Sequence, residues 1–207
     1  MRLFVALVPP PDVLDELEEA VLTHRDAIPE LRWVRRELLH VTLTFLGEVD
    51  DRTLTRLLPR LERAVGRHER MSLSLAGAGA FPGSGTHARV LWTGLFGDRR
   101  RVARLAASTT AAGRRVGTLP DRYRGFRPHL TLARSRSPVD VRPLLESLSA
   151  FAGSPWTAGS VQLMRSHLPG KEYRELTYEP LKSWSLRQSS GGGGAGRSAS
   201  GGPQGRP

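Results

Sequence analysis

Two segments of the chain repeat one strand pattern, and each carries a histidine where a buried strand would ordinarily carry an apolar residue. The first reads LHVTLTFLG at 39–47 and the second reads HLTLAR at 129–134. Side chains on a strand alternate between its two faces. His40 and Thr42 are therefore predicted to share one face, with the apolar residues on the other, and the same holds for the second copy. Each segment combines a core-facing side with a chemically active side.

The pattern of strands and helices also recurs in the two halves of the chain. This order, with few long βαβ spacers, favours an antiparallel α+β fold. Pro59 lies inside the second expected helix and should kink or split it. We expect strands at 2–8, 33–34, 39–46, 71–76, 88–95, 129–134, 156–165 and 172–178, and helices beginning at Asp12, beginning at Asp50 or Asp51, over 98–114 and over 138–150.

The length of 207 residues suits one domain or two small lobes that share a core. Residues 1–187 have the composition of a folded domain. Residues 188–207 read QSSGGGGAGRSASGGPQGRP. This segment cannot bury enough apolar surface to fold, so we expect a disordered tail.

The formal net charge of +11 points to an anionic partner, with nucleic acid as the first candidate. All but two of the 31 basic residues are arginine, asparagine is absent, and isoleucine occurs once. This skew is typical of a bias toward GC-rich codons, which accounts for part of the arginine excess. The tail contains two arginines and no acid, so the folded part keeps +9. Arginine also suits phosphate better than lysine does.

The chain has no cysteine, which excludes disulfides, thiolate zinc sites and cysteine nucleophiles. The apolar run at the start, RLFVALV, ends at a run of prolines and is too short for a signal-peptide core or a membrane span. We expect a soluble cytoplasmic protein that makes no membrane contact.

A pair of imidazoles is suited to acid–base chemistry, because histidine ordinarily titrates near pH ~6.5. One neutral ring can accept a proton from a nucleophile while one charged ring protonates a leaving oxygen. This combination serves in-line displacement at a phosphodiester. Thr42 and Thr131 would donate hydrogen bonds to the non-bridging phosphate oxygens. No carboxylate or third histidine lies at ligand spacing from His40 or His129, so we expect no metal and no cofactor.

The two H-x-T-x motifs resemble the signature of the 2H phosphoesterase superfamily, and other segments resemble its RNA 2′,3′-cyclic phosphodiesterase branch, formerly named 2′-5′ RNA ligases. The resemblance covers about residues 1–186. It rests on MRLFVALVPPP, LHVTLTFLGEV, GAFPGSGTHARVLWTGL, FRPHLTLAR and RSHLPGKEYREL.

The resemblance implies two pseudo-symmetric lobes, each an antiparallel sheet flanked by helices, with the active-site cleft between them. It implies opening of a 2′,3′-cyclic phosphate at an RNA 3′ end to leave a 2′-phosphate. His40 would then be the proton donor to the 3′ oxygen, and His129 the proton acceptor from water. Local sequence does not distinguish these two roles. The partners would be RNA ends or nucleotides that carry the cyclic phosphate, and we expect a monomer.

Three further positions near the motifs are candidates for substrate contact. Arg134 matches the family's trailing arginine and would bind phosphate. Its odd offset from His129 requires the strand to end or bulge near Ala133. Phe126 and Arg127 could line the site, with Phe126 stacking on a base, although packing or surface roles are open for both.

The first motif departs from the family at one position. Many relatives carry a basic residue before Phe-Leu-Gly, where this chain has Thr44. Strict alternation predicts that Thr44 shares the face of His40 and Thr42. The departure would change how the outer phosphates or the flanking nucleotide are bound.

Two alternatives stay open. The same site could act on small cyclic nucleotides, ADP-ribose cyclic phosphate or 2′-5′ oligonucleotides, and weak reverse 2′-5′ ligation is compatible with it because acid and base exchange roles. The other alternative is a non-catalytic RNA-binding module, against which the retention of both motifs argues.

Overall fold

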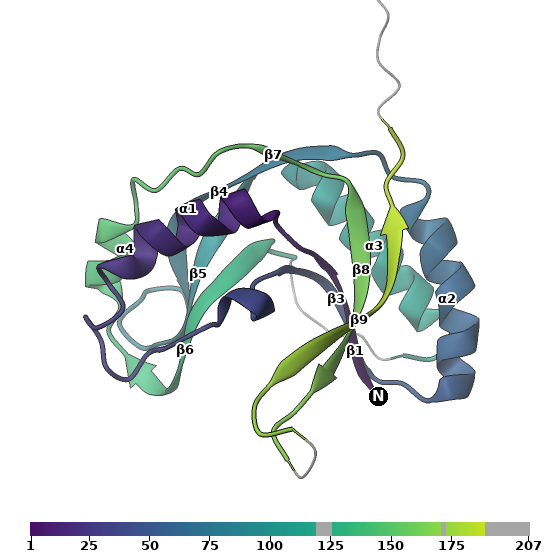
Figure 1. Cartoon of the computed structure of the whole chain (residues 1–207), viewed down its shortest axis with the longest axis horizontal. Coiled ribbons are helices and arrows are strands. Elements are labelled where there is room, and N and C mark those ends of the chain that lie inside the picture. The colour runs from purple at the N-terminus through teal and green to yellow at the C-terminus, as the bar shows by residue number, and fades with distance from the viewer. Residues whose placement is uncertain (119–125, 171–172, 189–207) are drawn as a thin grey trace, which may run out of the picture.

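The fold is an antiparallel sheet with helices packed at both ends (Figure 1). The structure, a computed structural model, describes residues 1–118, 126–170 and 173–188. Within these ranges the elements are β1 (Arg2–Leu7), α1 (Pro11–Leu22), β2 (Arg32–Trp33), a short 3-10 turn (Arg36–Leu38), β3 (Val41–Glu48), α2 (Asp51–Val65), β4 (Met71–Phe81), β5 (Ala88–Gly97), α3 (Arg99–Arg114), β6 (His129–Val139), α4 (Arg142–Ser147), β7 (Trp156–Ala158), β8 (Ser160–His167) and β9 (Thr177–Ser185).

The strands follow the order β7-β4-β5-β6-β3-β1-β8-β9, with β2 added beside β6. Figure 1 shows α1 and α4 over one end of this curled sheet and α2 and α3 over the other. The expected α+β class with antiparallel strands is therefore confirmed, and the sheets of the two halves join into one. The join is the contact between β3 and β6, where Val41 pairs with Leu130. The two motif strands consequently lie side by side at the centre of the molecule.

Strand β1 shows how the sheet separates its core from its other face. Leu3, Val5 and Leu7 are buried in the main hydrophobic core. Phe4 and Ala6 point to the opposite face, where they form a small cluster with Met164 and the partly buried Tyr178. Burying a side chain of this size contributes about 1.5–3 kcal/mol. The register of β1 is fixed from both sides, because a slip of one residue would exchange the two sets.

Helix α2 begins where its sequence provides a cap. The Asp50 carboxylate accepts a hydrogen bond from the Thr53 backbone N–H at 2.7 Å, which satisfies one free donor of the first turn. The helix then continues through Pro59, so the expected split does not occur. Pro59 lies on the exposed side of the helix, where water can bond the carbonyl that proline leaves free.

Several expected boundaries were wrong in the second half of the chain. Strand β6 runs to Val139, which pairs with Ala88, and only a short α4 remains of the helix expected over 138–150. The long partner strand β5 explains the difference, because it offers hydrogen bonds that extend β6 past the motif. The expected strand over 156–165 is divided into β7 and β8, and the strand expected over 172–178 begins later, as β9.

Among the described residues, no helix combines the length and apolar character needed to cross a bilayer. The tail predicted at 188–207 lies outside the described residues apart from Gln188.

Candidate active site

The register of β3 and β6 brings the two motifs together. Because Val41 pairs with Leu130 in an antiparallel sense, counting one residue each way places His40 beside Thr131 and Thr42 beside His129. The two histidines are then diagonal neighbours, for which backbone separations of about 7–8 Å are usual. Two residues 89 positions apart in the sequence thus face one small volume.

The ring of His40 is held from both of its nitrogen atoms. Nδ1 donates a hydrogen bond to the Leu38 carbonyl oxygen at 2.7 Å, and Nε2 lies 3.0 Å from Thr42 Oγ1. A carbonyl oxygen can only accept, so in the neutral ring the proton resides on Nδ1 and Nε2 is an acceptor. The rings of Phe4 and Tyr178 pack against the imidazole at centroid distances of 4.8 and 5.2 Å.

His129 repeats this arrangement on the other strand. Its Nδ1 donates to the Arg127 carbonyl oxygen at 2.7 Å, again the carbonyl two residues earlier. The rings of Phe81 and Trp92 lie 5.0 and 5.9 Å from the imidazole centroid. The Arg127 guanidinium lies over the Trp92 ring at 4.5 Å. In both histidines, therefore, Nδ1 is hydrogen-bonded to a backbone carbonyl, two aromatic side chains pack against the ring, and Nε2 points away from that carbonyl.

The surroundings favour the neutral form of both imidazoles. Burial lowers the pKa of His40 to about 4. The hydrogen bond to Leu38 opposes this shift, and the positive charges of Arg134 and His129 add to it. Burial also lowers the pKa of His129, and the charges of Arg134 and Arg127 act in the same direction. Arg134 thus acts on both rings. An anionic group placed between them would favour the charged forms and raise both pKa values.

A β-bulge places Arg134 on the face of the histidines. Opposite β5, Thr131 pairs with Trp92 but Ala133 pairs with Leu91, so Leu132 is the extra residue. One extra residue reverses the alternation that follows it. Arg134 then pairs with Val90, on the same face as Trp92. The condition set by the odd offset of Arg134 is met by this bulge.

A matching bulge in β3 overturns the expectation for Thr44. Opposite β1, Thr42 pairs with Ala6 but Thr44 pairs with Val5, so Leu43 is the extra residue. Thr44 therefore points into the core, where its exposed fraction is 5%. Its hydroxyl donates to the Ala106 carbonyl oxygen at 3.2 Å and lies within hydrogen-bonding distance of two threonine hydroxyls of α3.

Phe45 occupies the place that alternation had assigned to Thr44. It pairs with Phe4, and the two rings lie 6.2 Å apart. Phe45 is the fifth residue after His40, as Arg134 is the fifth after His129. It is 43% exposed, so an aromatic surface is available at the site of the predicted departure from the family.

The residues that hold the imidazoles were not identified from the sequence. Phe4 and Tyr178 come from β1 and β9, and Phe81 and Trp92 come from β4 and β5. Phe4 carried a usable signal, since it is the bulky residue on the side of β1 opposite Leu3 and Val5. Among the described residues, no three His, Asp or Glu side chains gather closely enough to hold a metal ion.

The fold and the site define a class of α+β protein in which two strands, each with an H-x-T-x motif, lie side by side in one sheet. Residues 9–169 match the family model described as the 2′-5′ RNA ligase superfamily. The chain belongs to this family.

Relatives of known name match over most of the chain. An RNA 2′,3′-cyclic phosphodiesterase from Archaeoglobus fulgidus is 32% identical over 85% of this chain and 98% of its own length. A protein of the same name from Thermus thermophilus is 33% identical over 100% of this chain and 98% of its own length.

Solved structures agree with the fold. TT0787 of Thermus thermophilus superposes with a TM-score of 0.74 at 29% identity, covering 91% of this chain and 100% of its own. E. coli LigT in its apo form gives 0.71 at 27% identity, covering 90% and 98%. E. coli LigT has also been solved in complex with 3′-AMP.

Proposed function

We propose that this protein opens RNA 2′,3′-cyclic phosphate ends to 2′-phosphate ends by metal-independent acid–base catalysis. The observation that carries the proposal is the matched pair of histidines. Each Nδ1 is bound to the carbonyl two residues earlier, so Nε2 is the nitrogen of each ring that is not bound to backbone, and His40 Nε2 is hydrogen-bonded to the Thr42 hydroxyl. The names of the relatives, RNA 2′,3′-cyclic phosphodiesterase, support the same substrate.

The reaction needs one proton removed and one supplied. His129 Nε2 takes a proton from water as the water oxygen bonds to phosphorus. The bond from phosphorus to the 3′ oxygen breaks on the opposite side, and His40 Nε2 protonates that oxygen. The phosphate stays on the 2′ oxygen. The assignment of donor and acceptor follows the family resemblance, since the two rings are held alike.

The protonation state of the free protein requires one step before this reaction. Both pKa values are lowered, and His40 titrates at about 4, so near neutral pH both rings begin as bases. A bound phosphodiester carries negative charge and draws a proton onto one of them. The same charge rearrangement is available in the reverse sense, which supports weak 2′-5′ ligation as a secondary activity.

The phosphate itself would be held by side chains on the shared face of the two strands. Thr42 and Thr131 offer hydroxyl donors, and Arg134 offers a guanidinium that the bulge turns to this face. Charged and hydroxyl donors fixed before the reaction stabilise the charge that develops on the phosphate oxygens. Phe45 offers a ring for stacking on a base.

A mononucleotide-sized substrate is the second candidate. E. coli LigT has been solved with 3′-AMP, which supports binding of a single nucleotide in a site of this shape. Small cyclic nucleotides, ADP-ribose cyclic phosphate and 2′-5′ oligonucleotides therefore belong in the same assay. A monomer in the cytoplasm remains a prediction from the sequence.

The test is product identification in EDTA with cyclic-phosphate-ended RNA. We expect a 2′-phosphate product, with activity reduced by at least about 100-fold in His40→Ala and in His129→Ala, because a positioned acid or base contributes about 10²–10⁴-fold. Unchanged turnover in either variant would remove the mechanism. A 3′-phosphate product would reverse the assignment of the broken bond, and tight RNA binding without turnover would establish the binding-module alternative.

A further inference from the structure

A second surface, rich in arginine and phenylalanine, continues from the His129 side of the site. It consists of Phe96, Arg99, Arg100, Arg104 and Phe126, and we call it the arginine–phenylalanine surface. Four of these residues, with Pro128, line an open depression of about 650 Å³. Pro128 directly precedes His129, so the depression reaches the catalytic strand.

Phe96 links this surface to the catalytic centre. Gly94 pairs with His129 across β5 and β6, and Phe96 follows two residues later on the same face. A Cβ atom at Gly94 would lie 3.8 Å from Phe96 Cε2, so the Phe96 ring leans over the residue beside His129. Two strand residues span about 7 Å, a length comparable with one nucleotide of an extended single strand.

The aromatic rings of this surface are open to solvent. Phe96 is 50% exposed and Phe126 is 38% exposed. Together with Phe45, they are the exposed phenylalanines of the described residues, and all three adjoin the motif strands. An exposed phenyl ring costs free energy in water, whereas a nucleobase can stack on it.

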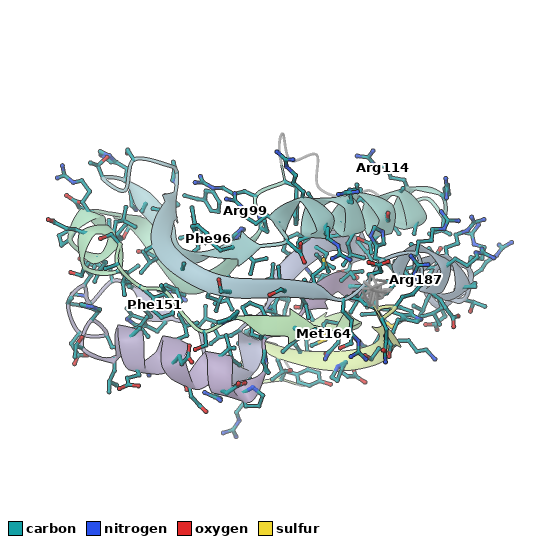
Figure 2. All side chains as sticks on the ribbon, turned by 90° about the horizontal axis from the view of Figure 1, so that it is seen from above. Phe96, Arg99, Arg114, Phe151, Met164 and Arg187 are labelled. Atoms are coloured by element: carbon teal, nitrogen blue, oxygen red, sulfur yellow. The ribbon has the colours of Figure 1, made fainter. Side chains whose placement is uncertain are left out.

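The arginines at the start of α3 do not stabilise this helix, so helix stability does not explain the positive charge of the surface. Arg99, Arg100 and Arg101 form its first turn, which contains no acidic residue. A helix N-terminus favours negative charge, so cations at this end oppose the helix dipole. Figure 2 shows Arg99 beside Phe96 at this end and Arg114 at the other. The Arg99 guanidinium lies 5.9 Å from the Phe96 ring centroid.

Most of this charge is also left without an acidic partner. Asp98, the acid in the depression, accepts from the Ser72 N–H and from Arg101, which also binds Glu69. Among the residues that the structure describes, no ion pair involves Arg99, Arg100 or Arg104. The positive potential of these three side chains therefore remains available to an anionic ligand.

We propose that the arginine–phenylalanine surface binds single-stranded RNA adjoining the scissile phosphate, which makes a polynucleotide a better substrate than a mononucleotide. The inference rests on the proposed function. Stacking rings beside arginines form a recognised mode of binding single strands without base readout. The occupant that we assign is the strand that carries the cyclic phosphate. An RNA with a 5′-hydroxyl end, which would attack in the ligation direction, is the alternative occupant that the experiment tests.

The experiment compares a nucleoside 2′,3′-cyclic phosphate with a short oligoadenylate ending in the same group. The variants are Phe96→Ala and the pair Arg99→Ala/Arg100→Ala. The matched control, Arg114→Ala/Arg115→Ala, removes the same charge from exposed positions at the other end of α3. Thermal unfolding of each variant verifies that the fold is retained.

We expect Phe96→Ala to lower kcat/KM for the oligonucleotide on the order of tenfold, as loss of one stacked base implies, with mononucleotide opening unchanged. The arginine pair should also reduce the salt dependence of oligonucleotide binding, by a slope of about 1.4 if both contact phosphates. The control pair should leave both substrates unaffected. A 5′-hydroxyl oligonucleotide is then added as a competitor of mononucleotide opening.

The outcomes separate the two strands and the two proposals. Selective loss with the cyclic-phosphate oligonucleotide supports that strand, and competition that disappears in the variants supports the 5′-hydroxyl strand. If wild type and variants have equal kcat/KM for the oligonucleotide and are equally inhibited by the 5′-hydroxyl competitor, the proposal that this surface binds RNA is overturned. If the wild type opens neither substrate, the proposed function fails, and fluorescence anisotropy with a labelled oligoadenylate still decides the surface: weaker binding by the variants supports it, and unchanged binding overturns it.

Discussion

The burial of His40 predicts a pH-dependent loss of stability that can be measured without any substrate. The fold lowers the pKa of His40 from its ordinary 6.5 to about 4. Between these two pH values the His40 imidazole is protonated in the unfolded chain but neutral in the folded chain. The His40 contribution to the free energy of unfolding is therefore complete above pH 6.5 and is lost as pH decreases. At about 1.36 kcal/mol per pKa unit, the whole effect is roughly 3 kcal/mol.

The perturbation is a change from about pH 7.5 to about pH 4.5, applied to the wild type and to His40→Gln. The His40 contribution lost over this range is about 2.5 kcal/mol. Urea unfolding at the two pH values gives the free energy of unfolding in each condition. The glutamine variant has no proton to gain at this position, so it should lose about 2.5 kcal/mol less than the wild type.

A matched control isolates the burial of His40 from the general acid sensitivity of the protein. His87 is exposed, and His87→Gln should keep the acid sensitivity of the wild type. The reasoning is refuted if His40→Gln loses as much stability as the wild type over the same range, because the imidazole would then not be held in its neutral form by the fold.

Three further predictions follow from the site. Both histidine pKa values are lowered in the free protein, so kcat/KM should reach its maximum below pH ~6.5. The maximum of kcat should lie at higher pH, because bound phosphate raises both histidine pKa values. Maxima of the two rate profiles that coincide at pH ~7 would contradict this. Thr44→Val should cost about 1–3 kcal/mol of stability through its lost buried hydrogen bonds and leave kcat/KM intact, whereas Thr42→Val should lower kcat/KM with little effect on unfolding; the reverse result would restore Thr44 to the site. Gly79→Ala would bring a Cβ atom 2.1 Å from Trp92 Cζ2, so we expect a loss of about 1–3 kcal/mol and reduced turnover, and an unchanged denaturation midpoint would show that the indole can move aside.

The part of the site that depends on short-range alternation could be predicted from the sequence. His40 and Thr42 lie two residues apart, and over that distance the alternation of a strand places both side chains on the same face. Thr44 lies beyond Leu43, where the bulge against β1 reverses the alternation. The letters VTLTF at 41–45 continue to alternate between apolar and polar residues through this point, so the bulge leaves no local trace in the sequence. It arises from how β1 pairs, which is a property of two distant strands.

Other features were hidden for the same reason. The hydrogen bonds from Nδ1 go to backbone carbonyls of Leu38 and Arg127, and every residue has such a carbonyl. The end of β6 depends on β5 as a partner, because Val139 stays in the strand by pairing with Ala88. Elements whose limits come from their own periodicity, such as α3, were located closely.

The paired bulges have a consequence for the direction of the reaction. The histidines and threonines of the two strands form a nearly symmetric centre, and a symmetric centre cannot by itself tell the nucleoside side of a phosphate from the water side. The first difference on the shared face comes five residues after each histidine, where one strand presents the flat apolar ring of Phe45 and the other the cation of Arg134. A ligand with a base at one end and a charge at the other fits such a pair in one orientation only. In the proposed reaction the proton would therefore have a preferred direction of travel, because the two repeats have the same histidines and threonines but differ at the residue that each bulge turns to the shared face.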